Sequence, residues 1–220
     1  MIDAVVFDLD GLLLDTEQVW DAVREGITRE RGGRWHDRAQ ADMMGMSSTE
    51  WSRYMHAELG LSEQPEELNR LVVERMQQRY RDGLPLIDGA VESVRRLAGR
   101  WSLGLASSSN RPLIDLALAE MGVADLFRAT VSSEEVPRGK PAPDVYLEAA
   151  RRLGVPPERI AAVEDSANGI RAAHAAGMRT IAIPNAHFPP PDDALDLADV
   201  RLSSLAELTA DAVESASSRP

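Results

Sequence analysis

Residues 4–11 read Ala-Val-Val-Phe-Asp-Leu-Asp-Gly, and this stretch decides the fold. Its first four residues are apolar and include two β-branched side chains, a composition typical of a short strand that is buried on both faces. The acidic residues and the glycine that follow are typical of a loop, so we expect the strand to end at Asp8. Asp8 and Asp10 then stand at the carboxyl end of a buried strand.

Further short apolar runs follow along the chain, and segments with helical periodicity separate them. The predicted strands cover residues 102–106, 129–131, 160–163 and 180–183. The predicted helices cover residues 91–97, 113–121, 145–153 and 170–176. Because strands that alternate with helices form βαβ units, the predicted fold class is α/β, with a Rossmann-like parallel sheet core and helices on both faces.

Residues 17–80 interrupt this alternation, because their apolar residues recur only at helical spacing. A purely helical block after the first strand of an α/β sheet indicates an inserted domain. We therefore predict an all-α cap at residues 16–84 and an α/β core formed by residues 1–15 and 85–220. Hinges are expected at residues 15–16 and 82–85.

The composition narrows the possible functions. The chain has 220 residues, 36 acidic and 24 basic side chains, a net charge of -12 and no cysteine. Without cysteine there are no disulfides, thiolate metal sites or cysteine nucleophiles. A net anion is repelled by a nucleic-acid backbone, and the first apolar run, broken by aspartates, predicts neither a signal peptide nor a membrane span. We expect a cytoplasmic monomer with no nucleic-acid or membrane partner.

Polar residues stand in the loops that follow the predicted strands. Ligands of open parallel sheets bind outside the carboxyl ends of the strands, so these residues are the candidates for a site. They are Asp8, Asp10, Ser107, Ser108, Lys140, Glu164 and Asp165. Lys140 is also the single lysine among the 24 basic residues. Since gathered carboxylates need a cation and hard oxygen ligands suit Mg²⁺, we predict magnesium as the cofactor.

Asp8 and Asp10 are two residues apart, so on an extended chain they share a face and can divide the work of phosphoryl transfer. One carboxylate can attack phosphorus while the other carries a proton. Lys140 and Ser107, with the metal ion, would offset the repulsion between the two anions. Taken singly, Asp-x-Asp-Gly is more typical of a turn, and Ser107 or Asp165 of a helix cap. Their convergence from four loops favours phosphoryl transfer.

Four segments resemble the haloacid dehalogenase superfamily of phosphohydrolases, in the group of β-phosphoglucomutases and small sugar phosphatases with a helical cap. They are residues 7–17 (FDLDGLLLDTE), 105–109 (LASSS), 140–146 (KPAPDVY) and 163–169 (VEDSANG). In order and spacing they cover nearly the whole chain. The resemblance implies a Mg²⁺-dependent phosphatase that hydrolyses small phosphomonoesters, in particular sugar phosphates, through an aspartyl-phosphate intermediate.

The resemblance also implies roles for both aspartates of the first segment. Asp8 is implied to be the nucleophile and a Mg²⁺ ligand. Asp10 is implied to protonate the leaving alcohol and then to deprotonate the attacking water, with its backbone carbonyl on the metal.

The remaining segments are implied to bind the phosphoryl group and the metal. Ser107, Ser108 and Lys140 would hold the phosphoryl oxygens of the substrate. Asp165 would complete the metal shell, and Glu164 would assist it directly or through water.

Departures from the mutase pattern favour hydrolysis. Mutases of this group carry a histidine and an arginine in the cap, at places that align here with Trp20 and Ser48. Without the arginine there is no evident clamp for a bisphosphate intermediate. A phosphohexomutase stays an alternative, as does a non-catalytic binding module on the same fold. Specificity is expected to depend on the cap residues Trp20, Met44, Gly45, Met46, Ser47, Ser48 and Trp51.

Overall fold

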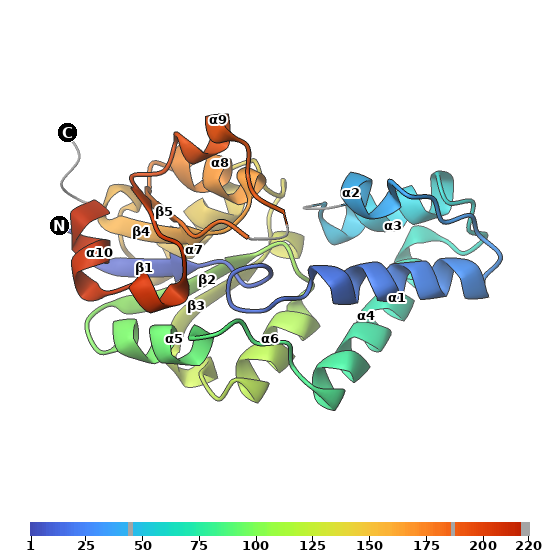
Figure 1. Ribbon diagram of the computed structural model, residues 1–220, viewed down its shortest axis with the longest axis horizontal. Coiled ribbons are helices and arrows are strands. Elements are labelled where there is room, and N and C mark those ends of the chain that lie inside the picture. The colour runs from blue at the N-terminus through green and yellow to red at the C-terminus, as the bar shows by residue number, and fades with distance from the viewer. Residues whose placement is uncertain (44–45, 186–187, 217–220) are drawn as a thin grey trace.

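A parallel sheet of six strands forms the centre of the molecule (Figure 1). The computed structural model describes residues 1–43, 46–185 and 188–216. The strands lie in the order β3-β2-β1-β4-β5-β6. They are β1 (Ala4–Phe7), β2 (Ser102–Ser107), β3 (Phe127–Ser132), β4 (Ile160–Glu164), β5 (Arg179–Ala182) and β6 (Val200–Arg201). The predicted α/β class is confirmed, and the sequence pattern does not predict β6 because two residues show no periodicity.

Strands β1, β2 and β4 run level with one another. Phe7 pairs with Leu105 of β2 and with Val163 of β4. The residues that follow these positions therefore emerge at the same edge of the sheet, where ligands of such folds bind.

Helices cover both faces of the sheet. Because alternate residues of a strand point to opposite faces, Val5 and Phe7 pack into one apolar cluster and Ala4 and Val6 into another. The first cluster includes side chains of α5 (Ala90–Ala98), α6 (Arg111–Glu120) and α10 (Ala210–Ala216). The second includes side chains of α7 (Asp144–Leu153) and α8 (Ala167–Ala175), and α9 (Asp192–Leu195) contacts α8. Short 3-10 helices lie at Ala124–Leu126, Ser133–Glu135, Pro157–Arg159 and Leu205–Glu207.

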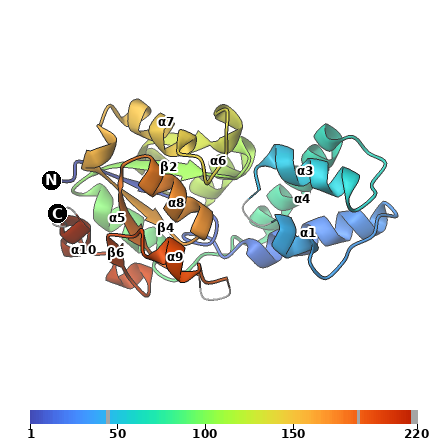
Figure 2. The ribbon, with the colours of Figure 1, turned by 90° about the horizontal axis from the view of Figure 1, so that it is seen from above.

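Four further helices between β1 and α5 form what we call the helical block, which lies beyond the carboxyl ends of the strands (Figures 1 and 2). They are α1 (Glu17–Glu30), α2 (Ala39–Met43), α3 (Ser48–Ala57) and α4 (Pro65–Asp82). A capping box between Ser47 and Glu50 starts α3, and Pro65 starts α4. Among the helices of the described residues, none has the length and apolar character that a membrane span requires.

Two connections join the helical block to the sheet, and hydrogen bonds hold them side by side. The backbone N–H of Asp15 donates to the carbonyl of Pro85 at 2.8 Å, and that of Ile87 donates to the carbonyl of Leu13 at 3.0 Å. The division into a core and a cap, with its boundaries beside these hydrogen bonds, stays a prediction.

Candidate active site

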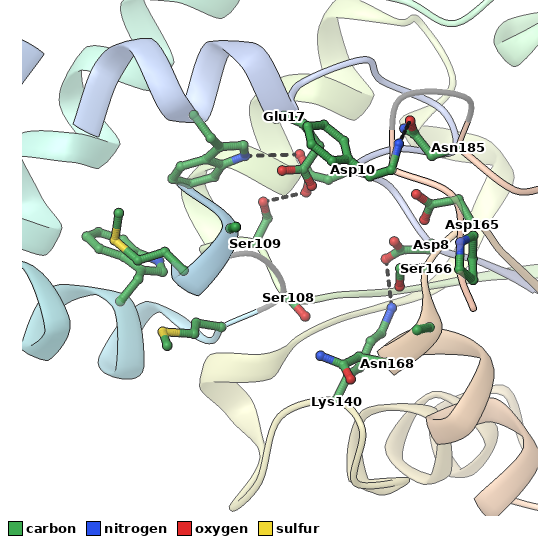
Figure 3. Close-up of a pocket in the computed structure, with 18 of the residues that line it drawn as sticks. Asp8, Asp10, Glu17, Ser108, Ser109, Lys140, Asp165, Ser166, Asn168 and Asn185 are labelled. Carbon is green, nitrogen blue, oxygen red and sulfur yellow. Dashed lines mark hydrogen bonds and ion pairs between the residues drawn. The ribbon is translucent and has the colours of Figure 1, made fainter. Parts of the chain in front are cut away.

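Lys140 lies within a buried group of charges at the carboxyl edge of the sheet (Figure 3). Its Nζ donates to Asp8 Oδ1 at 2.8 Å and to Glu164 Oε1 at 2.5 Å. The exposed fractions of Asp8, Lys140 and Glu164 are 6%, 7% and 0%. The fold thus brings together three of the predicted site residues from segments that are far apart in the sequence.

Glu164 accepts hydrogen bonds on both of its carboxylate oxygens. Its Oε1 accepts from Lys140 and from the hydroxyl of Tyr146 in α7 at 2.6 Å. Its Oε2 accepts from the backbone N–H of Asp165 at 3.1 Å. A Cβ atom at Gly169 in α8 would lie 1.8 Å from Glu164 Oε1. Two helices therefore enclose the carboxylate and hold it against Lys140.

Burial and neighbouring charges shift the pKa values in this group. Burial raises the pKa of Asp8 to about 7, although the charge of Lys140 opposes the shift. Burial alone would lower the pKa of Lys140, but the carboxylates of Asp8 and Glu164 raise it above its usual value. Burial, with the charges of Glu164 and Asp8, raises the pKa of Asp165 well above its usual range. The single positive charge of Lys140 does not balance the three buried carboxyl groups of Asp8, Glu164 and Asp165.

The donor atoms of this acidic group suit a metal ion. One oxygen from each of Asp8, Glu164 and Asp165 lies within 4.8 Å of the others. Oδ1 of Asp165 is buried, and none of the described residues offers it a hydrogen bond. Such an oxygen is costly to bury unless a cation or an ordered water meets it, and hard oxygen donors suit Mg²⁺. Both oxygens of Glu164 already accept hydrogen bonds. Asp8 and Asp165 are therefore the residues whose carboxylate oxygens are open to a metal ion.

Gly11 allows Asp165 to reach this position. Its φ of +82° favours glycine, and a Cβ atom there would lie 2.1 Å from Asp165 Oδ2. The glycine of the Asp-x-Asp-Gly stretch is therefore required both for the turn and for the close approach of the carboxylate.

Asp10 contacts both the sheet and the helical block. Its Oδ1 accepts from Thr16 Oγ1 at 2.6 Å and from Trp20 Nε1 at 3.4 Å. Its Oδ2 accepts from Ser109 Oγ at 2.6 Å, and the hydroxyl of Ser107 lies 3.5 Å away. These donors fix the direction of the carboxylate.

β1 ends at Phe7, and the chain turns at Gly11, directly after Asp10. Asp8 contacts Lys140, whereas Asp10 has other partners. Both carboxylates still line one cavity.

This cavity has a volume of about 460 Å³ and lies between the sheet edge and the helical block. Small-molecule sites typically measure about 300 to 1,000 Å³. From the loops after the strands, Asp8, Asp10, Ser108, Lys140 and Asp165 line it. From the helical block, it is lined by Glu17, Trp20, Arg24, Met43, Met46 and Trp51.

Comparison with known proteins agrees with this arrangement. A family model described as haloacid dehalogenase-like hydrolase matches residues 2–177. The chain belongs to the haloacid dehalogenase-like hydrolase family. The resemblance noted in the sequence and the expected enzyme class, a phosphoric monoester hydrolase, are confirmed.

Three similar proteins illustrate the relationship of this haloacid dehalogenase-like hydrolase. Hexitol phosphatase B of Escherichia coli (strain K12) is 36% identical over 215 residues, which are 94% of each chain. A probable pseudouridine-5'-phosphatase of Drosophila melanogaster is 36% identical over 190 residues, 82% of this chain and 80% of that protein. The crystal structure of CbbY from Rhodobacter sphaeroides in complex with phosphate is 27% identical, with a TM-score of 0.87 over 97% of this chain and 100% of that one.

The predicted specificity residues of this hydrolase fall into three groups. Those that line the cavity are Trp20, Met46 and Trp51. Those outside the described residues are Met44 and Gly45. Ser47 and Ser48 do not line the cavity, because Ser47 closes the capping box of α3 and Ser48 Oγ donates to Glu134 Oε1 at 2.9 Å.

The predicted phosphate-binding serines also differ in position. Ser108 lines the cavity, whereas Ser107 is fully buried and accepts from the backbone N–H of Ser109 at 3.0 Å. Ser107 therefore shapes the loop after β2.

Glu17 and Arg24 line the cavity but were not among the predicted site residues. They lie three residues before and four after Trp20 on α1, so all three share a helix face. The sequence feature that could have identified them is a charged residue within the apolar face of an amphipathic helix.

Proposed function

We propose that this hydrolase is a Mg²⁺-dependent phosphatase of small sugar phosphates and that it acts through an aspartyl-phosphate on Asp8. The observation that carries the proposal is the buried contact of 2.8 Å between Asp8 and Lys140 at the wall of a cavity of about 460 Å³. A carboxylate held beside a cation and open to a cavity suits attack on a phosphate ester. Similarity to hexitol phosphatase B supports a sugar or polyol phosphate as the substrate.

In the first step, an oxygen of Asp8 attacks the phosphorus, a P–O bond forms to Asp8, and the bond to the sugar oxygen breaks. Asp10 donates a proton to that oxygen, and the alcohol leaves. Lys140 keeps its proton at neutral pH because its pKa is raised, so it can offset the negative charge of the phosphoryl oxygens. Ser108 offers a hydroxyl on the same wall of the cavity.

In the second step, Asp10 removes a proton from water, the water oxygen attacks phosphorus, and the bond to Asp8 breaks. The hydroxyls of Thr16 and Ser109 each lie 2.6 Å from Asp10. A hydroxyl can rotate to donate to a carboxylate or to accept from a carboxylic acid. These two groups can therefore hold Asp10 in place in both protonation states.

Asp8, Asp165 and the backbone carbonyl of Asp10 are the groups proposed to hold Mg²⁺. The bound ion supplies positive charge that reduces the repulsion between Asp8 and the phosphoryl group. Glu164 holds Lys140 in place, since its oxygens accept from Lys140 and from other donors.

The helical block is proposed to act as a cap over the site. Thr16 and Trp20, at the start of the block, donate to Asp10 and so tie the block to the reacting groups. Closure over the cavity would exclude bulk water, with hinges at residues 15–16 and 82–85.

The phosphohexomutase alternative gains no support at Ser48. Its hydroxyl donates to Glu134, and its side chain does not line the cavity. We therefore favour hydrolysis over isomerisation.

Phosphate release from a panel of hexose, pentose and polyol phosphates, with Mg²⁺ and with EDTA, tests the proposal. We expect release that depends on Mg²⁺ and that falls by about 10⁴-fold or more in Asp8→Asn. Asp211→Asn is the matched control, because Asp211 is an exposed residue of α10. The proposal fails if no ester is hydrolysed or if Asp8→Asn keeps its activity. Isomerisation of β-glucose 1-phosphate that outpaces phosphate release would instead support the mutase.

A further inference from the structure

Arg24 is a buried arginine in the wall of the cavity. Its guanidinium carbon lies 4.6 Å from the centroid of the Trp20 ring and 5.1 Å from that of the Trp51 ring. The residue is only 5% exposed. Two indole rings therefore hold the planar guanidinium by cation–π contacts.

The Arg24 guanidinium has no hydrogen-bond partner among the described residues. No hydrogen bond or ion pair joins it to another side chain there, and its Nε is buried without an acceptor. Burial lowers the pKa of Arg24 to about 10, while the charges of Glu17, Asp10 and Asp21 oppose that shift. The side chain thus stays charged at neutral pH. A buried charge with unpaired donors is unfavourable unless a ligand completes its hydrogen bonds.

Glu17 supplies an acceptor on the same wall. Glu17 and Arg24 are seven residues apart on α1, about two helical turns, so both project from one face of the helix. Gln40 Nε2 donates to Glu17 Oε2 at 3.3 Å. Burial and the charge of Asp10 raise the pKa of Glu17 to about 7. The wall therefore presents donors and acceptors at two points, with Trp20 between them.

We propose that Arg24 and Glu17 form a subsite that binds hydroxyl groups at the end of the substrate remote from the phosphate. The assignment rests on the proposed phosphatase function and defines its substrate class as phosphates of a neutral, hydroxyl-rich chain. A hydroxyl can accept from Arg24 or donate to Glu17, so a chain that carries several hydroxyls can meet both side chains. A remote carboxylate or second phosphate would pair with Arg24 but would be repelled by Glu17 once Glu17 is ionised. The apolar surface of Trp20 and Trp51 borders the carbon chain.

The first test uses the unmodified protein and three substrates. They are hexitol 6-phosphate, hexyl phosphate, which lacks the hydroxyls, and 6-phosphogluconate, which has an anionic remote end. We expect kcat/KM to be highest for the hexitol phosphate, by about tenfold or more over each of the others. Equal values for the hexitol and hexyl phosphates would overturn the subsite, and a preference for 6-phosphogluconate would overturn the hydroxyl assignment.

The second test changes the arginine. Arg24→Met keeps an unbranched side chain between the two indole rings and removes the hydrogen-bond donors. Arg29→Met is the matched control, because the Arg29 side chain lies on the exposed side of α1 and is 71% exposed. We expect the kcat/KM ratio of hexitol phosphate to hexyl phosphate to fall by about 10- to 100-fold in Arg24→Met, mainly through KM. The ratio should not change in Arg29→Met. Equal losses on both substrates in Arg24→Met would contradict the subsite.

A binding measurement can test the Arg24 subsite independently of the proposed phosphatase activity. Calorimetry of hexitol 6-phosphate with Asp8→Asn and with Asp8→Asn/Arg24→Met needs no turnover. About tenfold weaker binding in the double variant supports the subsite, and equal affinity overturns it. If the unmodified protein hydrolyses no ester, the phosphatase proposal falls, while this binding comparison still decides the role of Arg24.

Discussion

Lys140 Nζ donates to Asp8 Oδ1 at 2.8 Å, although the two residues are 132 positions apart in the sequence. Strand β1 ends just before Asp8, and the loop after β3 brings Lys140 to the same edge of the sheet. The single lysine of the chain thus lies beside the carboxylate that we propose as the nucleophile.

Replacement of Lys140 by arginine is expected to lower activity although the charge is kept. The longer planar guanidinium cannot occupy the buried position of Nζ between Asp8 and Glu164 without displacing them. The expected cost is about 2 to 4 kcal/mol of transition-state stabilisation, measured from kcat/KM. Arg138→Lys, at a side chain that is 70% exposed, is the reverse control. Near-normal activity of Lys140→Arg would mean that a compact ammonium is not required.

Tyr146→Phe is expected to destabilise the protein. The hydroxyl of Tyr146 donates to Glu164 Oε1 at 2.6 Å, and both residues are fully buried. Its removal takes one hydrogen bond from a buried carboxylate, which should lower the free energy of unfolding by about 1 to 3 kcal/mol in urea titrations. Tyr54→Phe, at a less buried hydroxyl that donates to Asp42, should have a smaller effect. Equal effects of the two substitutions would show that the buried contact to Glu164 adds no more stability than the contact of Tyr54 to Asp42.

Gly169→Ala is expected to disrupt the site by displacing the carboxylate of Glu164. A Cβ atom at position 169 would lie 1.8 Å from Glu164 Oε1, so the carboxylate and Lys140 would have to move. We expect a loss of stability of about 2 kcal/mol or more, with a loss of activity. Gly26→Ala is the helical control, because the atom nearest to its added Cβ would be Arg75 Nη1 at 3.6 Å. That control should gain about 0.5 to 1 kcal/mol in the same unfolding assay. A stable, active Gly169→Ala protein would contradict the described packing.

The stability of the metal-free protein should fall as the pH rises from about 4 to about 7. Asp8 and Glu17 have pKa values of about 7 in the folded protein, against 3.8 and 4.5 ordinarily. The folded state therefore binds more protons than the unfolded state in this window, and stability decreases with pH. Mg²⁺ competes with protons for Asp8, so it should stabilise the protein more at pH 7.5 than at pH 5.

Urea midpoints in EDTA and in excess Mg²⁺ at the two pH values measure this effect. At 100 times the dissociation constant, Mg²⁺ should add about 2.7 kcal/mol. Asp8→Asn should reduce both the pH slope and the gain from Mg²⁺. Equal stabilisation by Mg²⁺ at pH 5 and pH 7.5 would count against Asp8 as a metal ligand.

The sequence was sufficient to predict the parallel sheet and to predict that the loops after its strands lie together at one edge. Buried strands of parallel sheets are short apolar runs, and their carboxyl ends share one edge, so Asp8, Lys140 and Asp165 could be placed together without side-chain detail. Strand β6 could not be predicted, because a strand of two residues is too short to show an alternation of apolar and polar residues.

The cap side of the cavity was harder to predict. Arg24 lies within a helical pattern, where a charged residue ordinarily faces solvent, and only its burial between Trp20 and Trp51 distinguishes it. Ser48 stands at the place that aligns with the cap arginine of the mutases. Its hydroxyl donates to Glu134, which is 86 residues away in the sequence, so local sequence cannot reveal this contact.

Covalent capture of the phosphoryl group on Asp8 tests the central proposal most directly. In Asp10→Asn, p-nitrophenyl phosphate needs no proton on its leaving group, so the first step should proceed while the second is slow. We predict a burst of one nitrophenol per protein molecule and, after acid quench, a phosphoryl group on Asp8 located by peptide mass spectrometry. The burst should be absent in Asp8→Asn/Asp10→Asn. A burst that persists without Asp8, or phosphate release with no covalent phosphoryl group on it, would contradict the proposed mechanism.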